Sequence, residues 1–200
     1  MEEARQQVFT SYNRGEKNGG YTYCTRCGSH LASLAVGAIQ RPTCPQCGWV
    51  HFKNPATGVA VLVVEGDQVL LGRRAQGHYA AGQWCLPGGF IEFDEDFLSA
   101  SLREVYEETG LSVEIQSILN VVSNFLAPGL HTLVIVLLAR VVQGAAAPGD
   151  DLSELRWHSL GCALPQMAFT ADQYIVELYG KTKPPGLPVD SRYARWKDLA

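Results

Sequence analysis

Apolar residues follow two different periods along this chain, and each period predicts one kind of element. Runs rich in β-branched residues are typical of strands, and Glu65-Gly66-Asp67 between the first two runs is a hairpin signal. The strands are expected over residues 58–65, 68–73, 112–123 and 131–142, with a short one beginning over 154–157. The longest apolar runs, 59–64 and 133–139, are far below the roughly 18 residues that span a bilayer, so no membrane segment is expected.

Two segments have the spacing of helices. The first starts at Asp96 and ends at Gly110, with acidic residues before its first turn and one apolar stripe. The stripe consists of Phe97, Leu98, Leu102 and Val105. The second is expected to start with Thr170 as its N-cap and to run to Tyr179. Strands interspersed with two helices predict a mixed sheet between helical layers, which is an α/β fold.

The first helix carries three glutamates on one face. Glu104, Glu107 and Glu108 are three and four residues apart, so at 3.6 residues per turn their negative charges converge. A divalent cation would remove the repulsion, and carboxylates with open positions suit Mg²⁺ or Mn²⁺. The alternative is a solvated acidic face. Arg103 inside the cluster and Glu95 at the helix start favour the metal, because the arginine can hold a glutamate in one rotamer.

The spacing of these residues resembles the box of the Nudix hydrolase family. The matching positions are Gly89, Glu95, Arg103, Glu104, Val105, Glu107, Glu108, Gly110 and Leu111. The resemblance implies an α/β/α sandwich over residues 53–180. It also implies that Glu104, Glu107 and Glu108 bind Mg²⁺ or Mn²⁺ together with the Gly89 carbonyl, while Arg103 and Glu95 pair to orient them.

Four of the six cysteines come as two close pairs. Cys24-Thr-Arg-Cys27-Gly and Cys44-Pro-Gln-Cys47-Gly each place two thiolates around a tight turn, and four thiolates favour tetrahedral Zn²⁺. Protein ligands fill all four positions, which favours a structural role. Disulfides are the alternative, and the lack of a secretory signal in MEEARQQVFT argues against them. We therefore expect a small zinc ribbon and a cytoplasmic location.

The expected organisation is an N-terminal extension over 1–20, the zinc ribbon over 21–52, the Nudix domain over 53–180 and a tail over 181–200. The extension has a short possible helix followed by turns, and the tail is either mobile or docked on a partner subunit. The chain has 200 residues, 46% hydrophobic content and a net charge of -4, without a basic run. This balance argues against nucleic acid as the main partner, although residues 21–57 contain no Asp or Glu.

The family resemblance implies metal-dependent hydrolysis of a nucleoside diphosphate linked to another group, giving two monophosphates. A ribbon before the domain is similar to NADH pyrophosphatases, but the chain reads Ser-Asn-Phe-Leu-Ala-Pro-Gly over 123–129 where those enzymes have Ser-Gln-Pro-Trp-Pro-Phe-Pro. ADP-ribose and flavin adenine dinucleotide are therefore expected before NADH. The alternatives are RNA-end processing, hydrolysis of nucleoside triphosphates, and a nucleotide-sensing module without catalysis. Glu107 or Glu108 is the candidate general base, and a homodimer is expected from the resemblance.

Further candidates lie outside the box. Arg73 and Arg74 leave a strand together, and arginine suits phosphate through its bidentate fork, with a solvated strand end as the alternative for either one. Tyr79 or Phe125 is a candidate for stacking on adenine or flavin, with a place in the core as the alternative. Glu154, before Trp157, is the candidate for an additional metal-binding carboxylate, with an exposed acid as the alternative.

Overall fold

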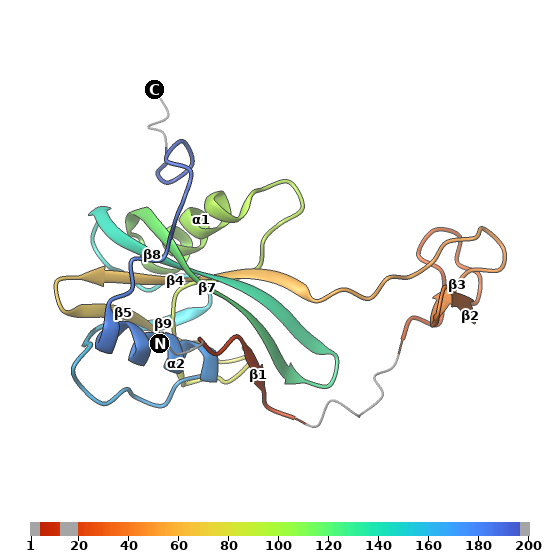
Figure 1. Cartoon of the computed structure of the whole chain (residues 1–200), viewed down its shortest axis with the longest axis horizontal. Coiled ribbons are helices and arrows are strands. Elements are labelled where there is room, and N and C mark those ends of the chain that lie inside the picture. The colour runs from red at the N-terminus through yellow and green to blue at the C-terminus, as the bar shows by residue number, and fades with distance from the viewer. Residues whose placement is uncertain (1–4, 13–19, 197–200) are drawn as a thin grey trace.

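The computed structural model describes residues 5–12 and 20–196, and within them one large mixed sheet dominates (Figure 1). Its strands run in the order β1-β7-β8-β4-β5-β6, with β9 paired to β5 and β10 paired to β7. β4 and β8 are parallel, as are β1 and β7, whereas β7 and β8 form a long antiparallel hairpin. The strands are β1 (Val8–Thr10), β4 (Ala56–Glu65), β5 (Gln68–Arg74), β6 (Trp84–Cys85), β7 (Ser112–Ala127), β8 (Leu130–Gln143), β9 (Leu152–Ser159) and β10 (Leu187–Pro188).

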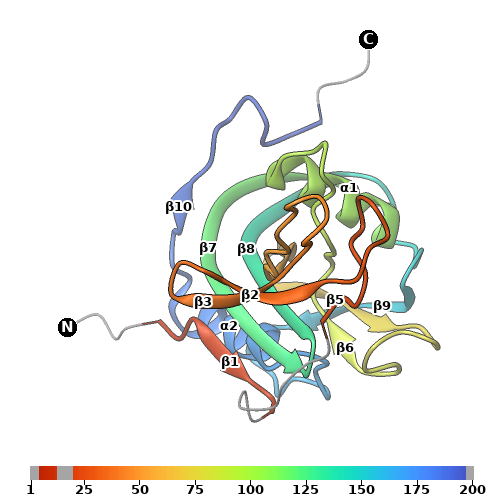
Figure 2. The ribbon, with the colours of Figure 1, turned by 90° about the vertical axis from the view of Figure 1, so that its right-hand side faces the viewer.

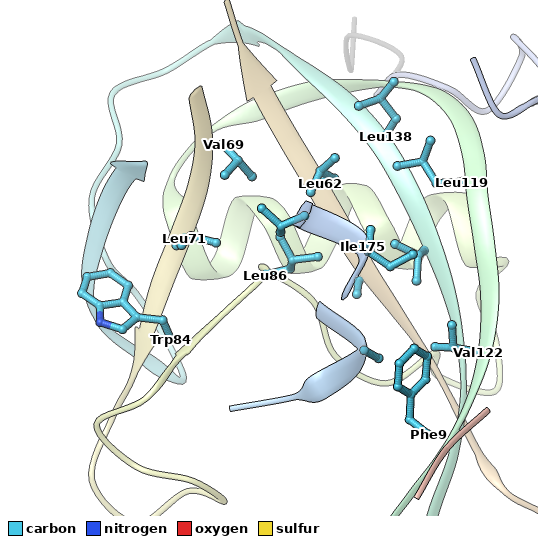
Figure 3. Close-up of a cluster of buried hydrophobic side chains, with 14 residues drawn as sticks. Phe9, Leu62, Val69, Leu71, Trp84, Leu86, Leu119, Val122, Leu138 and Ile175 are labelled. Carbon is cyan, nitrogen blue, oxygen red and sulfur yellow. The ribbon is translucent and has the colours of Figure 1, made fainter. Parts of the chain in front are cut away.

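Each face of this sheet is covered by one helix, so the expected α/β/α sandwich is confirmed. Successive side chains of a strand point to opposite faces. On β4, Leu62 packs with Ile175 of α2 (Thr170–Thr182), as Figure 3 shows. Val61 and Val63 pack with Val105 of α1 (Phe97–Thr109) on the other face. The continuous apolar run in β4 therefore reflects burial on both sides.

The ends of α1 agree with the sequence, whereas the start of α2 does not. The Asp96 side chain caps α1 by accepting hydrogen bonds from the N–H groups of Leu98 and Ser99, and Gly110 ends it at a left-handed φ of 70°. The predicted N-cap at Thr170 is wrong. Phe169 occupies that position, and it makes no side-chain cap because its ring has no hydrogen-bond acceptor; the ring is stacked on Tyr79.

The described segments nearest the two ends of the chain contact the sheet. Phe9 on β1 is buried against Tyr174, and β1 adds a parallel edge strand to β7 where the sequence suggested a short helix, so that prediction is wrong. The turns expected over 13–19 lie outside the described residues. At the other end, β10 pairs with β7 and Arg195 forms an ion pair with Glu114. The C-terminal segment thus docks on its own domain as far as residue 196, whose ring packs on Tyr106 of α1.

The cysteine-rich segment forms a small separate body at the end of the linker into β4 (Figures 1 and 2). Its strands β2 (Ala32–Val36) and β3 (Ile39–Thr43) pair with each other, and Thr43 also forms an isolated bridge with Val50. Gly28 and Gly48 have φ values of 73° and 74°, a left-handed conformation that lets the chain turn back after each cysteine pair. In the described ranges, no helix has the length and apolar character needed to cross a membrane.

Candidate active site

The candidate site is a cavity of about 500 Å³ that begins at α1 and continues along the α2-facing side of the sheet. Carboxylates and Gly88-Gly89 line one end, and we call this the glutamate end. The residues of the glutamate end are Gly88, Gly89, Glu104, Glu108, Asp150 and Asp151. Arg74, His78, Tyr79, Phe169 and Asp172 also line the cavity, so its polar groups come from six separate segments of the chain.

Glu104 and Glu108 are buried at the glutamate end, one helical turn apart on α1. Burial raises the pKa of Glu104, and burial together with the charge of Glu104 raises the pKa of Glu108 to about 8, even though the Gly88 N–H donates to Glu108 at 2.8 Å. The third predicted ligand, Glu107, is exposed and is not among the described residues that line the cavity. The structure therefore brings two of the three glutamates into the cavity.

Arg103 holds the carboxylates of the box in place. Its guanidinium donates to Glu95 at 3.1 and 2.5 Å, to Glu104 at 2.8 Å and to Glu107 at 2.9 Å. It also donates to the Phe90 carbonyl at 3.1 Å. These bonds lower the pKa of Glu95 and raise that of Arg103. The pairing of Arg103 with Glu95 implied by the family resemblance is therefore present, and the same guanidinium also joins two of the predicted metal ligands.

Neighbouring atoms lie so close to Gly88 and Gly89 that a side chain does not fit at either position. A Cβ on Gly89 would lie 2.5 Å from a carboxylate oxygen of Glu104, and a Cβ on Gly88 would lie 2.2 Å from the Val59 carbonyl. The Gly89 carbonyl, a predicted metal ligand, accepts a hydrogen bond from the Val59 N–H at 2.9 Å. The loop is thus fixed to β4 and lies directly against the Glu104 carboxylate.

The loop before β9 supplies two acids that the sequence did not single out. The Ala147 and Gly149 N–H groups donate to the Thr109 and Glu108 carbonyls at 2.9 and 3.0 Å, so the loop covers the C-terminal end of α1. This docking brings Asp150 and Asp151 to the cavity wall, and Asp150 is close enough to raise the pKa of Glu104 through its charge. The only sequence signal was their place in the Asp-rich loop.

Glu154, the acid chosen from the sequence, lies elsewhere. It is the cross-strand partner of Arg73, and its carboxylate accepts from Arg73 at 3.4 Å and from Arg156 at 2.9 Å. Arg73 and Glu154 are absent from the described cavity lining. Arg73 and Glu154 therefore form an ion pair with each other on the exposed surface of the sheet, outside the cavity.

Arg74 differs from Arg73 because it lines the cavity and is nearly buried. Its Nε donates to the Tyr79 carbonyl at 2.6 Å, and its terminal nitrogen lies 3.7 Å from Asp151. The positive charge of Arg74 lowers the pKa of both Glu108 and Asp172, although burial keeps the pKa of Asp172 raised, to about 7. Arg74 is therefore the cation that acts on acids from both helices.

One of the two aromatic candidates lines the cavity. Tyr79 lies in the lining, stacked on Phe169 with a centroid distance of 5.8 Å, and Arg74 sits over the Phe169 ring. Phe125 does not belong to the described lining, and its ring stacks on His131 at 3.9 Å. Phe169 itself was missed, because it precedes a helix and carries no distinguishing pattern in the sequence.

The donor set at the glutamate end suits a hard divalent cation. Glu104 and Glu108 are buried carboxylates, and burial raises their pKa values even though Arg103 donates to Glu104 and the charge of Arg74 acts on Glu108, so a cation at this end would stabilise their ionised forms. Within the described ranges, the cysteines 24, 27, 44 and 47 form the one cluster whose ligand atoms all lie within 4.8 Å of one another. The carboxylates are not gathered as closely among the described residues, and Glu104 and Glu107 are joined through the Arg103 guanidinium.

The four cysteines have the geometry of a zinc site. The Sγ atoms of Cys24 and Cys47 are 3.7 Å apart, and those of Cys27 and Cys44 are 3.5 Å apart. A tetrahedron with Zn–S bonds of about 2.3 Å has sulfur atoms about 3.8 Å apart, close to both distances. The two pairs expected from the sequence are therefore brought together as a group that could hold a metal ion.

Comparison with known proteins agrees with this site. A family model described as the NUDIX domain matches residues 54–179. The chain belongs to the Nudix family. It is 31% identical over 148 residues to an ADP-ribose pyrophosphatase of Methanocaldococcus jannaschii, covering 74% of this chain and 78% of that protein. It is 29% identical over 160 residues to the NAD-capped RNA hydrolase NudC of Pseudomonas aeruginosa, covering 78% of this chain and 55% of NudC.

Solved structures show the same fold. A NUDIX hydrolase from Nitrosomonas europaea aligns with a TM-score of 0.71 and 26% identity, covering 84% of this chain and 96% of that one. The family resemblance inferred from nine spaced residues is confirmed by these matches. Nudix hydrolases depend on metal ions, which agrees with the donor set at the glutamate end.

Proposed function

We propose that this chain hydrolyses the diphosphate bond of a nucleoside diphosphate linked to a second group, with ADP-ribose as the first substrate to test and flavin adenine dinucleotide and NADH after it. The observation that carries the proposal is one cavity in which buried Glu104 and Glu108 lie beside Arg74. A diphosphate carries the charge that a metal and an arginine would neutralise together. The similarity to an ADP-ribose pyrophosphatase supports this substrate class.

Magnesium or manganese at the glutamate end would polarise the diphosphate and lower the pKa of an attacking water. Glu104 and Glu108 hold the ion, Arg103 fixes the rotamers of Glu104 and Glu95, and Arg74 binds a phosphate oxygen. The proton of the attacking water passes to a carboxylate that faces the cavity. Glu108 is a stronger candidate for that base than Glu107, which is exposed and paired with Arg103.

We assign the additional metal-binding carboxylate to Asp150 rather than Glu154. Asp150 lines the cavity and acts electrostatically on Glu104, whereas Glu154 is paired with Arg73 and Arg156. The hydrogen bonds from the loop to the last turn of α1 hold Asp150 at the cavity wall.

The experiment is hydrolysis of ADP-ribose with Mg²⁺ or Mn²⁺, followed by separation of AMP and ribose 5-phosphate. Glu108→Gln is expected to lower kcat by at least about 100-fold, since a charged ligand is replaced by a neutral one of equal size. The matched control is Glu177→Gln, an exposed glutamate of α2 outside the cavity, which should leave kcat unchanged. Full activity in Glu108→Gln would contradict the metal site, and release of pyrophosphate from nucleoside triphosphates alone would contradict the substrate.

The ribbon over residues 21–52 is proposed to hold one structural Zn²⁺ on Cys24, Cys27, Cys44 and Cys47, and the catalytic domain to span residues 53–180. A homodimer is proposed from the family resemblance alone, and a mass measurement in solution tests it.

A second candidate, hydrolysis at the end of a nucleotide-capped RNA, is favoured by the surface of the ribbon. Tyr21, Tyr23 and Phe52 are exposed there, and Arg41 lies over the Phe52 ring at 4.7 Å. Exposed aromatic rings with cations suit stacked single-stranded bases, and NudC is a relative. Binding of a short single-stranded RNA should weaken steeply with salt, and Phe52→Ala should weaken it at every salt concentration through the loss of stacking. RNA binding without either dependence would exclude this candidate.

A further inference from the structure

The part of the cavity away from the glutamates has a different character. Along the β7–β8 hairpin its lining is apolar except for two polar side chains, and we call this part the hairpin floor. The hairpin floor consists of Asn124, Leu126, Leu130, Thr132 and Val134. It contains no charged residue, so it is suited to a flat, neutral group rather than to phosphate.

Asn124 and Thr132 are a cross-strand pair on this floor. Their Cα atoms are register partners in the hairpin, so both side chains point to the same face of the sheet, the face that α2 covers. Each is only 6% exposed. Two polar side chains have thus been placed side by side in an apolar setting.

Neither side chain has a protein partner that accounts for its burial. Among residues 5–12 and 20–196, no hydrogen bond is present for the Asn124 amide, and the buried Thr132 hydroxyl is likewise unpartnered. Asn120, four residues earlier on the same strand, is also buried, but it donates to the Gln6 carbonyl and accepts from Gln7. A buried polar group without a partner destabilises a fold, so the enclosed Thr132 hydroxyl points to a ligand.

The floor lies within reach of a nucleotide held at the glutamate end. Thr132 pairs with Ala56 on β4, three residues before Val59, whose N–H donates to the Gly89 carbonyl. At about 3.3 Å per residue, the two places are about 10 Å apart along the strand. The ribose and phosphate of a nucleotide bridge a separation of this size.

We propose that Asn124 and Thr132 bind the edge of the adenine base of the substrate, while Leu126, Leu130 and Phe169 contact its faces. A carboxamide offers one donor and one acceptor side by side, which matches the N6 amino group and N7 of adenine. Hypoxanthine and guanine present two acceptors at the same edge, so the same amide satisfies only one of them. The inference rests on the proposed function for its substrate, and it adds the residues that select the base.

The test compares ADP-ribose with its inosine counterpart in wild type, Asn124→Leu and Thr132→Val. The wild type should prefer ADP-ribose in kcat/KM by about 10-fold or more, the discrimination expected of a bidentate pair. Asn124→Leu should bring that ratio close to one, mainly through KM, and Thr132→Val should lower it less. Asn120→Leu is the matched control, because it removes a buried amide of the same strand that does not line the cavity, and it should keep the ratio.

A stability measurement separates binding from a structural role. Replacing an unpartnered buried amide by leucine should leave the melting temperature of Asn124→Leu equal or higher, whereas Asn120→Leu breaks three hydrogen bonds and should melt lower. A lower melting temperature in Asn124→Leu with an unchanged substrate ratio would overturn the inference, as would a wild type that does not distinguish the two bases.

Failure of the proposed function gives a different result. If the wild type hydrolyses neither compound, calorimetric titration with AMP and with inosine monophosphate still tests the floor. Tighter binding of AMP by the wild type, lost in Asn124→Leu, supports the base site without hydrolysis. Equal affinity for both nucleotides contradicts it.

Discussion

Replacing Glu108 by glutamine should stabilise the protein when no divalent cation is added, and the effect should grow with pH. Glu108 is 2% exposed, and burial together with the charge of Glu104 raises its pKa from 4.5 to about 8. A carboxyl whose pKa is higher in the folded than in the unfolded state stabilises the fold below the unfolded pKa. That stability is lost as pH rises through the folded pKa. The wild type should therefore lose stability between about pH 4.5 and 8.

The size of the effect follows from the same shift. With about 1.4 kcal/mol per pKa unit, the loss reaches at most about 5 kcal/mol at high pH and about 4 kcal/mol near pH 7.5. For a chain of this length that corresponds to roughly 10 °C in melting temperature. Glutamine cannot ionise, and its carbonyl can still accept the Gly88 N–H, so the variant should show no such loss from this position.

The assay is calorimetric unfolding at pH 5.5 and 7.5 after dialysis without a chelator, so that the ribbon keeps its metal. Asp172, whose pKa is also raised, is present in both proteins, and the difference between them isolates Glu108. Glu107→Gln is the control, because Glu107 is exposed and should follow the wild type. Added Mg²⁺ should stabilise the wild type more than Glu108→Gln. Parallel losses in wild type and Glu108→Gln would refute the assignment of a buried, uncompensated charge.

Three further results are expected. Cys44→Ser should lose most of the zinc, measured by elemental analysis against about one ion per wild-type chain, whereas the exposed Cys162→Ser should keep it. Asp150→Asn should raise the Mg²⁺ concentration needed for half-maximal hydrolysis and Glu154→Gln should not, and the opposite order would return the role to Glu154. Gly89→Ala should lower kcat by about 100-fold, because the new Cβ would lie 2.5 Å from the Glu104 carboxylate and displace it. Unchanged turnover would show that the loop moves to accommodate the methyl group.

The elements that the sequence predicted well are those whose signals are local. The start and end of α1 follow from Asp96 as a cap and Gly110 as a left-handed terminus, both visible in the sequence and both present. β1 has no such signal. Phe9 becomes buried because β7 offers a free edge 115 residues later, and only the assembled sheet determines that partner.

The cavity shows the same division between local and distant information. Glu104 and Glu108 share one face of one helix, so their spacing alone brings them together. Asp172 is on the other helix, and it reaches the cavity where the Leu86 N–H donates to its carboxylate at 3.0 Å. Asn124 enters through the register of a long hairpin. Neither position is marked by its neighbours in the sequence.

Whether Asp150 or Glu154 faces the cavity depends on strand register, because a shift of one residue turns every side chain of a strand to the other face of the sheet. The pairing of β5 with β9 contains an irregularity between Arg73 and Arg74: Arg73 is opposite Glu154, and Arg74 is opposite Leu152. Gly72 leaves the space that the Leu152 side chain fills, since a Cβ there would lie 2.2 Å from it. With Leu152 fixed in this space, Glu154 must point toward Arg73 and away from the cavity. Arg74 then points toward the glutamate end. The same irregularity therefore keeps Glu154 out of the cavity and places Arg74 in it.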